Sequence, residues 1–303
     1  MQELFRKAKL LSTAINISKN SLQKNLEYLA SNELRGRETG TEGIEKAASF
    51  IEKSFTKSGL QPYFETYRDS FEVKGKVGYN IIGYIEGTDK ELKDEFIILG
   101  AHYDHVGLGK VVNGDSIANG ANDNAAGTVA VMGLAEYFGK KKINKRSLLF
   151  VLFSAEEMGL VGAKYAAANL KEKGLDLYAM VNLEMIGVPM QGKNFAAYLT
   201  GFENSNMAQK FNEYSNAEVL GYLPEAKQYN LFKRSDNYPF YEEFKVPAQT
   251  ISTFDFTNYE FYHHVSDQSE KMDFAHMASL VEKIIPALTK MANTPEKEIK
   301  LNK

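Results

Sequence analysis

The sequence predicts an α/β fold in which helices cover both faces of a largely parallel sheet. Five short apolar runs, each long enough for one buried strand, occur between residues 79 and 253. Patterns typical of amphipathic helices lie between several of these runs. Apolar strands that alternate with helices are typical of a parallel sheet packed between two helical layers.

Helices are expected before the first strand. Apolar residues recur at helical spacing in residues 18–30 and 39–60, where Ile44 and Ile51 share one face. Thr41 is a suitable start for the second helix, and Gly59 is a suitable end.

The remaining elements are expected in alternation along one domain. Strands are predicted at residues 79–87, 95–102, 147–155, 179–187 and 246–253, and helices at 125–140, 159–174 and 277–294. No repeat or long linker divides the chain. We therefore expect a single domain over residues 21–293, an N-terminal extension (1–20) and a C-terminal tail (294–303).

Composition excludes several classes of protein. The 303-residue chain has a formal net charge of −3, so no overall positive charge favours nucleic acid or an anionic membrane. We interpret the densest basic run, residues 139–146, as a solvated loop. No stretch approaches the roughly 18 apolar residues of a membrane-spanning helix. The absence of cysteine excludes disulfides, thiolate metal sites and cysteine nucleophiles.

Side chains that can bind metal stand where the predicted strands end. Because open α/β sheets carry their functional residues at the carboxyl ends of the strands, these side chains are expected to lie close together. They are His102, Asp104, His105, Asp123, Glu156, Glu157, Glu184, His263 and His264.

Imidazoles and carboxylates without thiols are the donor set of hydrolytic zinc sites, or of cobalt or manganese sites. Two histidines and three carboxylates suffice for two ions that share a bridging carboxylate. A further carboxylate can then act as general base, and the adjacent Glu156 and Glu157 can divide these roles because they point in different directions. Structural interpretations stand beside this one: a strand-end histidine can belong to the core, a glutamate pair can be solvated, and Asp123 can cap a helix.

With these residues identified, the sequence resembles a family of zinc aminopeptidases that includes bacterial leucyl aminopeptidases, glutamate carboxypeptidase and glutaminyl cyclase. The resemblance covers about residues 25–290. It rests on eight motifs in order: ELRGRETGTEG, YNIIGYIEG, GAHYDHVG, GANDNAAGT, FSAEEMGLVGAKYA, NLEMIG, RSDNYPF and YHHVSDQSEKMD. It implies a three-layer αβα sandwich with a central mixed, largely parallel twisted sheet, and a catalytic domain without an inserted accessory domain.

The resemblance also implies a role for each metal-site residue. His102 would bind the first ion, and Asp104 would orient its imidazole. Asp123 would bridge the two ions, Glu156 would be the general base and Glu157 a ligand. Glu184 would be a ligand where the family usually has aspartate, which requires a backbone set further back or another binding mode.

The last ligand and the pocket are assigned by register. His263 stands four residues before Asp267, as the family ligand does, so it is preferred over His264. His105 is interpreted as lining the cleft. Ser235 and Asp236 match the family's SDH turn and are assigned to the substrate pocket, although Asn237 replaces the histidine. Residues 188–229 are expected to form a lid or pocket wall, with candidate aromatic residues Phe195, Tyr198, Phe202 and Tyr222.

The function implied is that of an exopeptidase with two divalent ions, expected to be Zn²⁺, that removes N-terminal residues from peptides with a free N-terminus. Alternatives are a single-zinc glutaminyl cyclase, a carboxypeptidase that uses Lys233 or Arg234 to hold the substrate carboxylate, and a binding module without activity. The N-terminus lacks the pattern of a signal peptide. A periplasmic or extracellular location is expected if a signal was removed, and a cytoplasmic one otherwise. The sequence does not indicate an oligomeric state.

Overall fold

A computed structural model describes residues 17–303 of the chain. Its main sheet has the strand order β1-β3-β7-β4-β8-β11-β9-β10, with β2 paired to β3. The strands are β1 (Gln61–Pro62), β2 (Arg68–Val73), β3 (Lys76–Ile85), β4 (Glu95–His102), β7 (Ser147–Phe153), β8 (Asp176–Leu183), β9 (Ala197–Leu199), β10 (Leu220–Gly221) and β11 (Ala248–Ser252). A separate hairpin joins β5 (Leu108–Val112) and β6 (Asp115–Ile117).

The centre of the sheet is parallel. Strand β4 pairs in parallel with β7 and β8, and β8 pairs in parallel with β11. Antiparallel strands flank this centre: β3 pairs with β7 on one side, and β9 pairs with β11 on the other. The carboxyl ends of the four central strands therefore meet at one edge.

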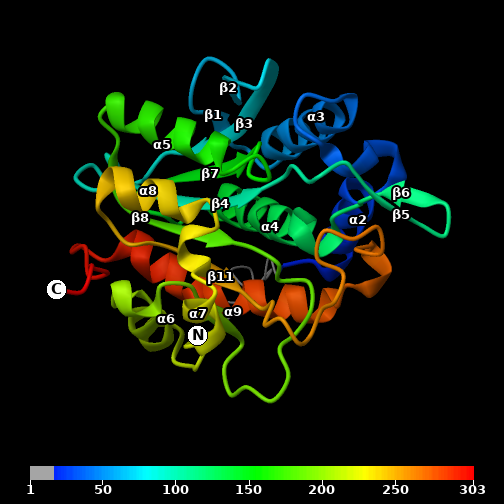
Figure 1. Cartoon of the computed structure of the whole chain (residues 1–303). Coiled ribbons are helices and arrows are strands. Elements are labelled where there is room, and N and C mark those ends of the chain that lie inside the picture. Colours follow the sequence, from blue (N-terminus) through cyan, green and yellow to red (C-terminus); the bar gives the residue numbers. More distant parts are fainter. Residues whose placement is uncertain (1–16) are drawn as a thin grey trace, which may run out of the picture.

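Helices cover both faces of the sheet, as Figure 1 shows for α5 and α8 on one side and α9 on the other. Alternate residues of β7 enter the two cores: Leu148, Phe150 and Leu152 face one, and Leu149, Val151 and Phe153 face the other. The second core is completed by α5 (Val161–Glu172) and α8 (Asn237–Phe244). The first core packs against α2 (Lys19–Leu29), α3 (Glu42–Lys57), α4 (Ala126–Lys141), α6 (Met207–Ser215) and α9 (Phe274–Asn293). The predicted three-layer α/β fold is confirmed.

The long elements follow the sequence predictions to within a few residues, since each has either a strong apolar run or a helical period. The elements that the sequence did not reveal are mostly short: β1, β2, β5, β6, β9, β10, α6, α8 and α7 (Pro224–Gln228). Elements this short carry too few residues for a period to be recognised. The segment at residues 61–78, which is too short for an accessory domain, extends the edge of the sheet instead.

The interpretation of residues 139–146 as a solvated loop is wrong for residues 139–141, which belong to α4, and for Asn144 and Arg146, which are buried. Lys142 and Lys145 are exposed, but Arg146 is fully buried. Its Nε donates to Glu95 at 2.6 Å, and its Nη1 donates to the carbonyl of Met291 at 3.1 Å. A guanidinium can be buried in this way because an acidic partner and carbonyl oxygens satisfy its donors.

The two ends of the chain differ in what the structure describes. Residues 1–16 of the predicted N-terminal extension lie outside the described residues. At the other end, Ile299 is buried and the backbone N–H of Asn302 donates to Asn204, so the predicted tail lies against the domain. Within residues 17–303, no helix is both long and apolar enough to cross a membrane.

Candidate metal centre

The candidate site forms at the carboxyl edge of the parallel strands. His102 is the last residue of β4, Glu156 and Glu157 follow β7, and Glu184 follows β8. Asp123 comes from the turn at Ala121–Ala125 that precedes α4, and His263 comes from the loop between β11 and α9. The topology thus brings together residues separated by up to 161 positions in the sequence.

Two groups of donor atoms lie side by side at this edge. In the first donor group (His102, Glu156 and Glu184), one donor atom of each residue lies within 4.8 Å of the others. In the second donor group (His105, Asp123 and Glu157), the same limit holds. Asp123 connects the two groups, because its Oδ1 lies 3.4 Å from Nε2 of His102 while its Oδ2 lies 3.9 Å from Nδ1 of His105.

His263 reaches the second donor group from the loop that follows β11. Its Nε2 lies 3.0 Å from Oε2 of Glu157 and 3.3 Å from Oδ2 of Asp123. His264 instead turns toward its own loop, where its Nδ1 accepts a hydrogen bond from the N–H of Ser266 at 3.0 Å. Of these two neighbours, His263 is therefore the one that lies in the site.

Two aspartates fix the backbone on which the donors stand. Asp104 accepts hydrogen bonds from the N–H groups of Glu156 (3.1 Å) and Glu157 (3.3 Å), and its Oδ1 lies 3.7 Å from Nδ1 of His102. Asp267 accepts hydrogen bonds from the N–H groups of Asn122 (2.8 Å) and Asp123 (3.0 Å). In the sequence, Asp267 indicated only the register of His263. Its presence in the motif next to His263 is the signal that could have indicated this role.

Arg37 was given no role from the sequence, although it belongs to the motif ELRGRETGTEG. It is 1% exposed, and it donates to the carbonyl groups of Tyr103 (2.8 Å) and Gly120 (2.9 Å). It therefore ties the loop after β4 to the turn that carries Asp123. Burial lowers the pKa of Arg37 to about 10, which keeps it charged at neutral pH beneath the acidic cluster.

The charge of the site fits bound cations. Six carboxyl groups converge here (Asp104, Asp123, Glu156, Glu157, Glu184 and Asp236), and the basic side chains described near them are Arg37, Arg234 and the imidazoles of His102, His105 and His263. Within residues 17–303, Nε2 of His102 and Oδ2 of Asp123 are buried without a hydrogen-bond partner. Buried polar atoms normally have partners, so these two unpartnered atoms and the excess of carboxylates fit a bound metal ion.

The carboxyl groups differ in how they are stabilised. Burial raises the pKa of Glu156 well above its usual range, and neighbouring carboxylates contribute in the same direction. Burial also raises the pKa of Glu184 to about 7. Burial acts in the same direction on Asp123 and Glu157, but imidazole contacts outweigh it and lower both pKa values. Those contacts raise the pKa of His263 to about 10 against the effect of burial.

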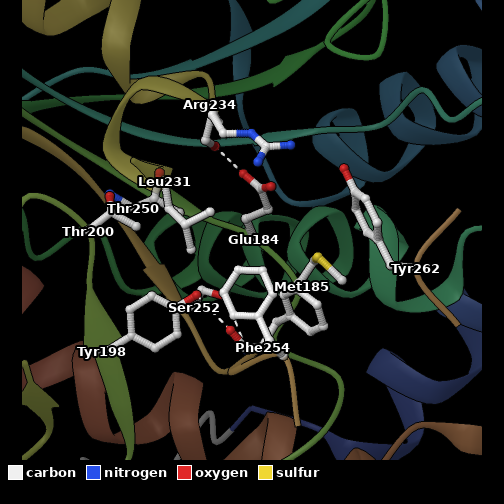
Figure 2. A pocket seen from close by; sticks show the side chains of 12 residues that line it. Glu184, Met185, Tyr198, Thr200, Leu231, Arg234, Thr250, Ser252, Phe254 and Tyr262 are labelled. Carbon is white, nitrogen blue, oxygen red and sulfur yellow. Dashed lines mark hydrogen bonds between the residues drawn. The ribbon is translucent and has the colours of Figure 1, made fainter. Parts of the chain in front are cut away.

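A cavity of about 190 Å³ opens beside Glu184. Figure 2 shows Glu184 between the side chains of Arg234 and Tyr262, with Tyr198 and Phe254 on the other side of the cavity. The rest of the wall includes Met185, Leu231 and Phe256, and hydroxyl groups of Thr200, Thr250 and Ser252. The cavity is thus mostly apolar, with one cationic side chain among its lining residues.

Ser235 and Asp236, predicted as pocket residues, lie at this end of the site. The hydroxyl of Ser235 donates to Oε2 of Glu184 and accepts from Nδ2 of Asn182 at 2.8 Å. Asp236 is fully buried, neither of its oxygens has a hydrogen-bond partner in the described chain, and its charged neighbours include His102 and Glu184. Of the two basic candidates, Arg234 lines the cavity, whereas Nζ of Lys233 lies 5.6 Å from the centroid of the Tyr238 ring.

Of the candidate aromatic residues in residues 188–229, only Tyr198 lines this cavity. Phe202 and Tyr222 line a different cavity, where their ring centroids are 5.6 Å apart. Phe195 packs beside Gly221. The predicted pocket wall therefore comes largely from residues 231–262, outside the segment that the sequence indicated.

The fold and the donor groups together define an α/β protein with a candidate metal centre at the carboxyl edge of its sheet. Residues 80–288 match the model described as Peptidase family M28. The chain belongs to this family and is a peptide-bond hydrolase, and the resemblance that the motifs indicated is confirmed.

Known proteins resemble the chain in sequence or in fold. The chain is 26% identical over 302 residues to a probable leucine aminopeptidase of Arthroderma otae, a match that covers 96% of this chain and 77% of that protein. It shares the fold of a zinc aminopeptidase from Bacillus subtilis, with a TM-score of 0.71, 14% identity, and 93% and 97% of the two chains covered. It also shares the fold of glutaminyl cyclase from Porphyromonas gingivalis, with a TM-score of 0.70, 17% identity, and coverage of 90% and 98%.

Proposed function

We propose that the protein is a zinc aminopeptidase in which two ions share Asp123. The observation that carries this proposal is the position of Asp123, whose two oxygens face His102 on one side and His263 on the other. His102, Asp123 and Glu184 would hold the first ion, and Asp123, Glu157 and His263 would hold the second. A pair of such ions supplies an activated water and a polarised carbonyl when bound.

Glu156 is surplus to these two sets of ligands and is proposed as the general base. It lies in the first donor group, and its backbone is held by Asp104. Its raised pKa suits a carboxyl group that accepts a proton from the attacking water and then donates it to the leaving amine.

The cavity beside Glu184 is proposed to take the side chain of the N-terminal residue. Its walls of Met185, Tyr198, Leu231 and Phe254 favour apolar side chains such as leucine, methionine or phenylalanine. A free α-amine would lie close to Glu184 and the neighbouring carboxylates, which explains a requirement for an unblocked N-terminus.

The test replaces Glu156 by Gln and measures zinc content and leucyl-anilide hydrolysis together. We expect two zinc ions per chain in both proteins and a decrease in kcat of roughly 10²–10⁴-fold in the variant. Glu282→Gln, on the exposed face of α9, is the matched control and should retain wild-type turnover. Near-normal turnover of E156Q would exclude Glu156 as the base, and one ion or none in the wild type would exclude the two-metal centre.

A carboxypeptidase is the second candidate, because Arg234 lines the cavity and could hold a substrate carboxylate. Blocked peptides distinguish the two activities. The aminopeptidase should leave N-acetylated peptides intact and cleave peptides with an amidated C-terminus, and a carboxypeptidase should do the reverse. Conversion of N-terminal glutamine to pyroglutamate on an otherwise intact peptide, with release of ammonia, would instead indicate a cyclase.

A further inference from the structure

We infer that His105 is a positioning residue for the second metal ion and holds the carboxylate of Glu157 through a hydrogen bond. The inference rests on the proposed two-metal centre. It assigns a function to a histidine that the sequence indicated only as part of the cleft wall.

The two oxygens of Glu157 are held by two different histidines. Nδ1 of His105 lies 2.9 Å from Oε1, and Nε2 of His263 lies 3.0 Å from Oε2. The two imidazoles differ in exposure: the side chain of His263 is 36% exposed, whereas that of His105 is fully buried. His263 thus stands on the open side of the carboxylate and His105 on the protein side.

The position of the His105 ring is fixed on two sides. Its backbone N–H donates to the carbonyl of Arg37 at 3.3 Å. The ring packs on Gly120, where an added Cβ would lie 2.5 Å from Cγ of His105. Gly120 also has a φ of +60°, so the turn that carries Asp123 has glycine where the imidazole needs space.

The surroundings of the ring indicate which nitrogen carries the proton. Nε2 of His105 is buried without a hydrogen-bond partner in the described chain. A proton on Nε2 would leave a buried donor unsatisfied and would direct the lone pair of Nδ1 at a carboxylate oxygen. A proton on Nδ1 instead gives both Nδ1 and the Oε1 atom of Glu157 a hydrogen-bond partner. Nδ1–H of His105 therefore donates to Oε1 of Glu157.

This hydrogen bond has a consequence for metal binding. Nδ1 cannot bind an ion while it donates a proton, so His105 acts through Glu157 rather than as a ligand. With Oε1 held, Oε2 is directed toward Asp123 and His263, where the second ion would be bound. A partner that orients a ligand in this way typically changes metal affinity by about 10- to 100-fold when removed.

Two isosteric substitutions test the inference. In His105→Asn the side-chain amide nitrogen can take the place of Nδ1, whereas in His105→Gln it reaches toward the place of Nε2. Zinc affinities of the metal-free proteins are measured by competition with a chelating dye. His263→Ala removes a proposed ligand of the second ion and so identifies the zinc dissociation constant of the second metal position. His276→Ala on α9 is a histidine control outside the site.

We expect H105Q to weaken the second position by 10- to 100-fold and to change the first by less than about threefold, with H105N close to wild type. Unchanged affinity of H105Q at both positions would overturn the inference. So would equal losses in H105Q and H105N, because these would make His105 a direct ligand. If wild-type protein binds fewer than two ions, the proposed function itself fails, which is a different result from either of these.

Discussion

Glu184 shows how one extra methylene is accommodated at this site. Its backbone N–H donates to Ile251 at 3.1 Å, which continues the pairing of β8 with β11, so its Cα stays in register with the sheet. The hydroxyl of Ser235 instead bonds Oε2 of the longer side chain. These contacts favour the second of the two alternatives, another binding mode of the carboxylate, which stays a prediction.

Arg234 is predicted to select against basic N-terminal residues. It lines the cavity, and no carboxylate lies within ion-pair distance of it among residues 17–303. Its charge should therefore repel a lysyl side chain. We expect Arg234→Glu to raise kcat/KM for lysyl anilide roughly tenfold relative to leucyl anilide, a ratio that corresponds to about 1.4 kcal/mol.

The neutral variant Arg234→Gln serves as the control and should give an intermediate ratio. Leucyl-anilide hydrolysis should remain within about threefold of wild type in both variants. An unchanged lysyl-to-leucyl ratio in R234E would show that the guanidinium does not act on the bound side chain.

At the scale of elements, the start of α4 packs closely against the end of β8, and this contact is part of the site. Nδ2 of Asn124 donates to the carbonyl of Leu183 at 3.0 Å, and its Oδ1 accepts from the N–H groups of Gly127 and Met185. One side chain thus joins the turn of Asp123 to the strand end of Glu184. The distance between the two proposed metal positions depends on this junction.

Gly127→Ala is predicted to disrupt that junction. An added Cβ would lie 2.2 Å from the carbonyl oxygen of Leu183 and 2.5 Å from Oδ1 of Asn124, so α4 must move away from β8. We expect a loss of about 1–3 kcal/mol in the free energy of unfolding, measured with denaturant, and a loss of zinc bound per chain.

Gly133→Ala is the matched control on the same helix. Its added Cβ would lie 3.4 Å from the flexible end of Leu22, which is an ordinary contact. Replacing glycine by alanine inside a helix favours folding by up to about 1 kcal/mol, so G133A should be neutral or stabilising. Equal effects of the two substitutions would refute the close fit at Gly127.

At the scale of the whole molecule, the carboxyl groups of the metal-free site are electrostatically unfavourable for the folded state. Six carboxyl groups converge at one edge of the sheet, and burial raises the pKa values of Glu156, Glu184 and Asp236. The fold can hold them because β4, β7 and β8 are anchored in two large cores, which fix the strand ends.

The metal-free protein is predicted to lose stability as pH rises. Glu184 has a pKa of about 7 in the folded chain against the ordinary 4.5 of a glutamate, so the folded chain binds more protons between these values. The stability that this proton provides, roughly 3 kcal/mol, is present below pH 4.5 and lost as pH rises to 7. His263 acts with the same sign, because its pKa is raised to about 10 and its contribution is lost as pH rises toward that value.

Thermal unfolding checks this prediction. The Tm of metal-free protein should be higher at pH 5.5 than at pH 8.5, whereas added zinc should raise the Tm more at pH 8.5 because the ligands are then deprotonated. A Tm of the metal-free protein that is constant or increases over this range would contradict the raised pKa values.

The sequence by itself determined the layers of the fold, the main strands and the edge at which the site forms. Each of these depends on local patterns: apolar runs in β4, β7 and β8, helical periods in α3 and α4, and the residues directly after each strand. The strand-end rule then brought His102, Asp123, Glu157 and Glu184 to one edge without any knowledge of distances.

Only the tertiary structure decided which atoms meet. The roles of Arg37 and Asp267 depend on hydrogen bonds to backbone groups far away in the chain, and no local pattern records such partners. The same is true of the contact between His105 and Glu157, which are 52 positions apart. The order of the strands decides the residues that stand at one edge of the sheet. The contacts between individual nitrogen and oxygen atoms depend instead on side-chain packing, to which residues from the whole chain contribute.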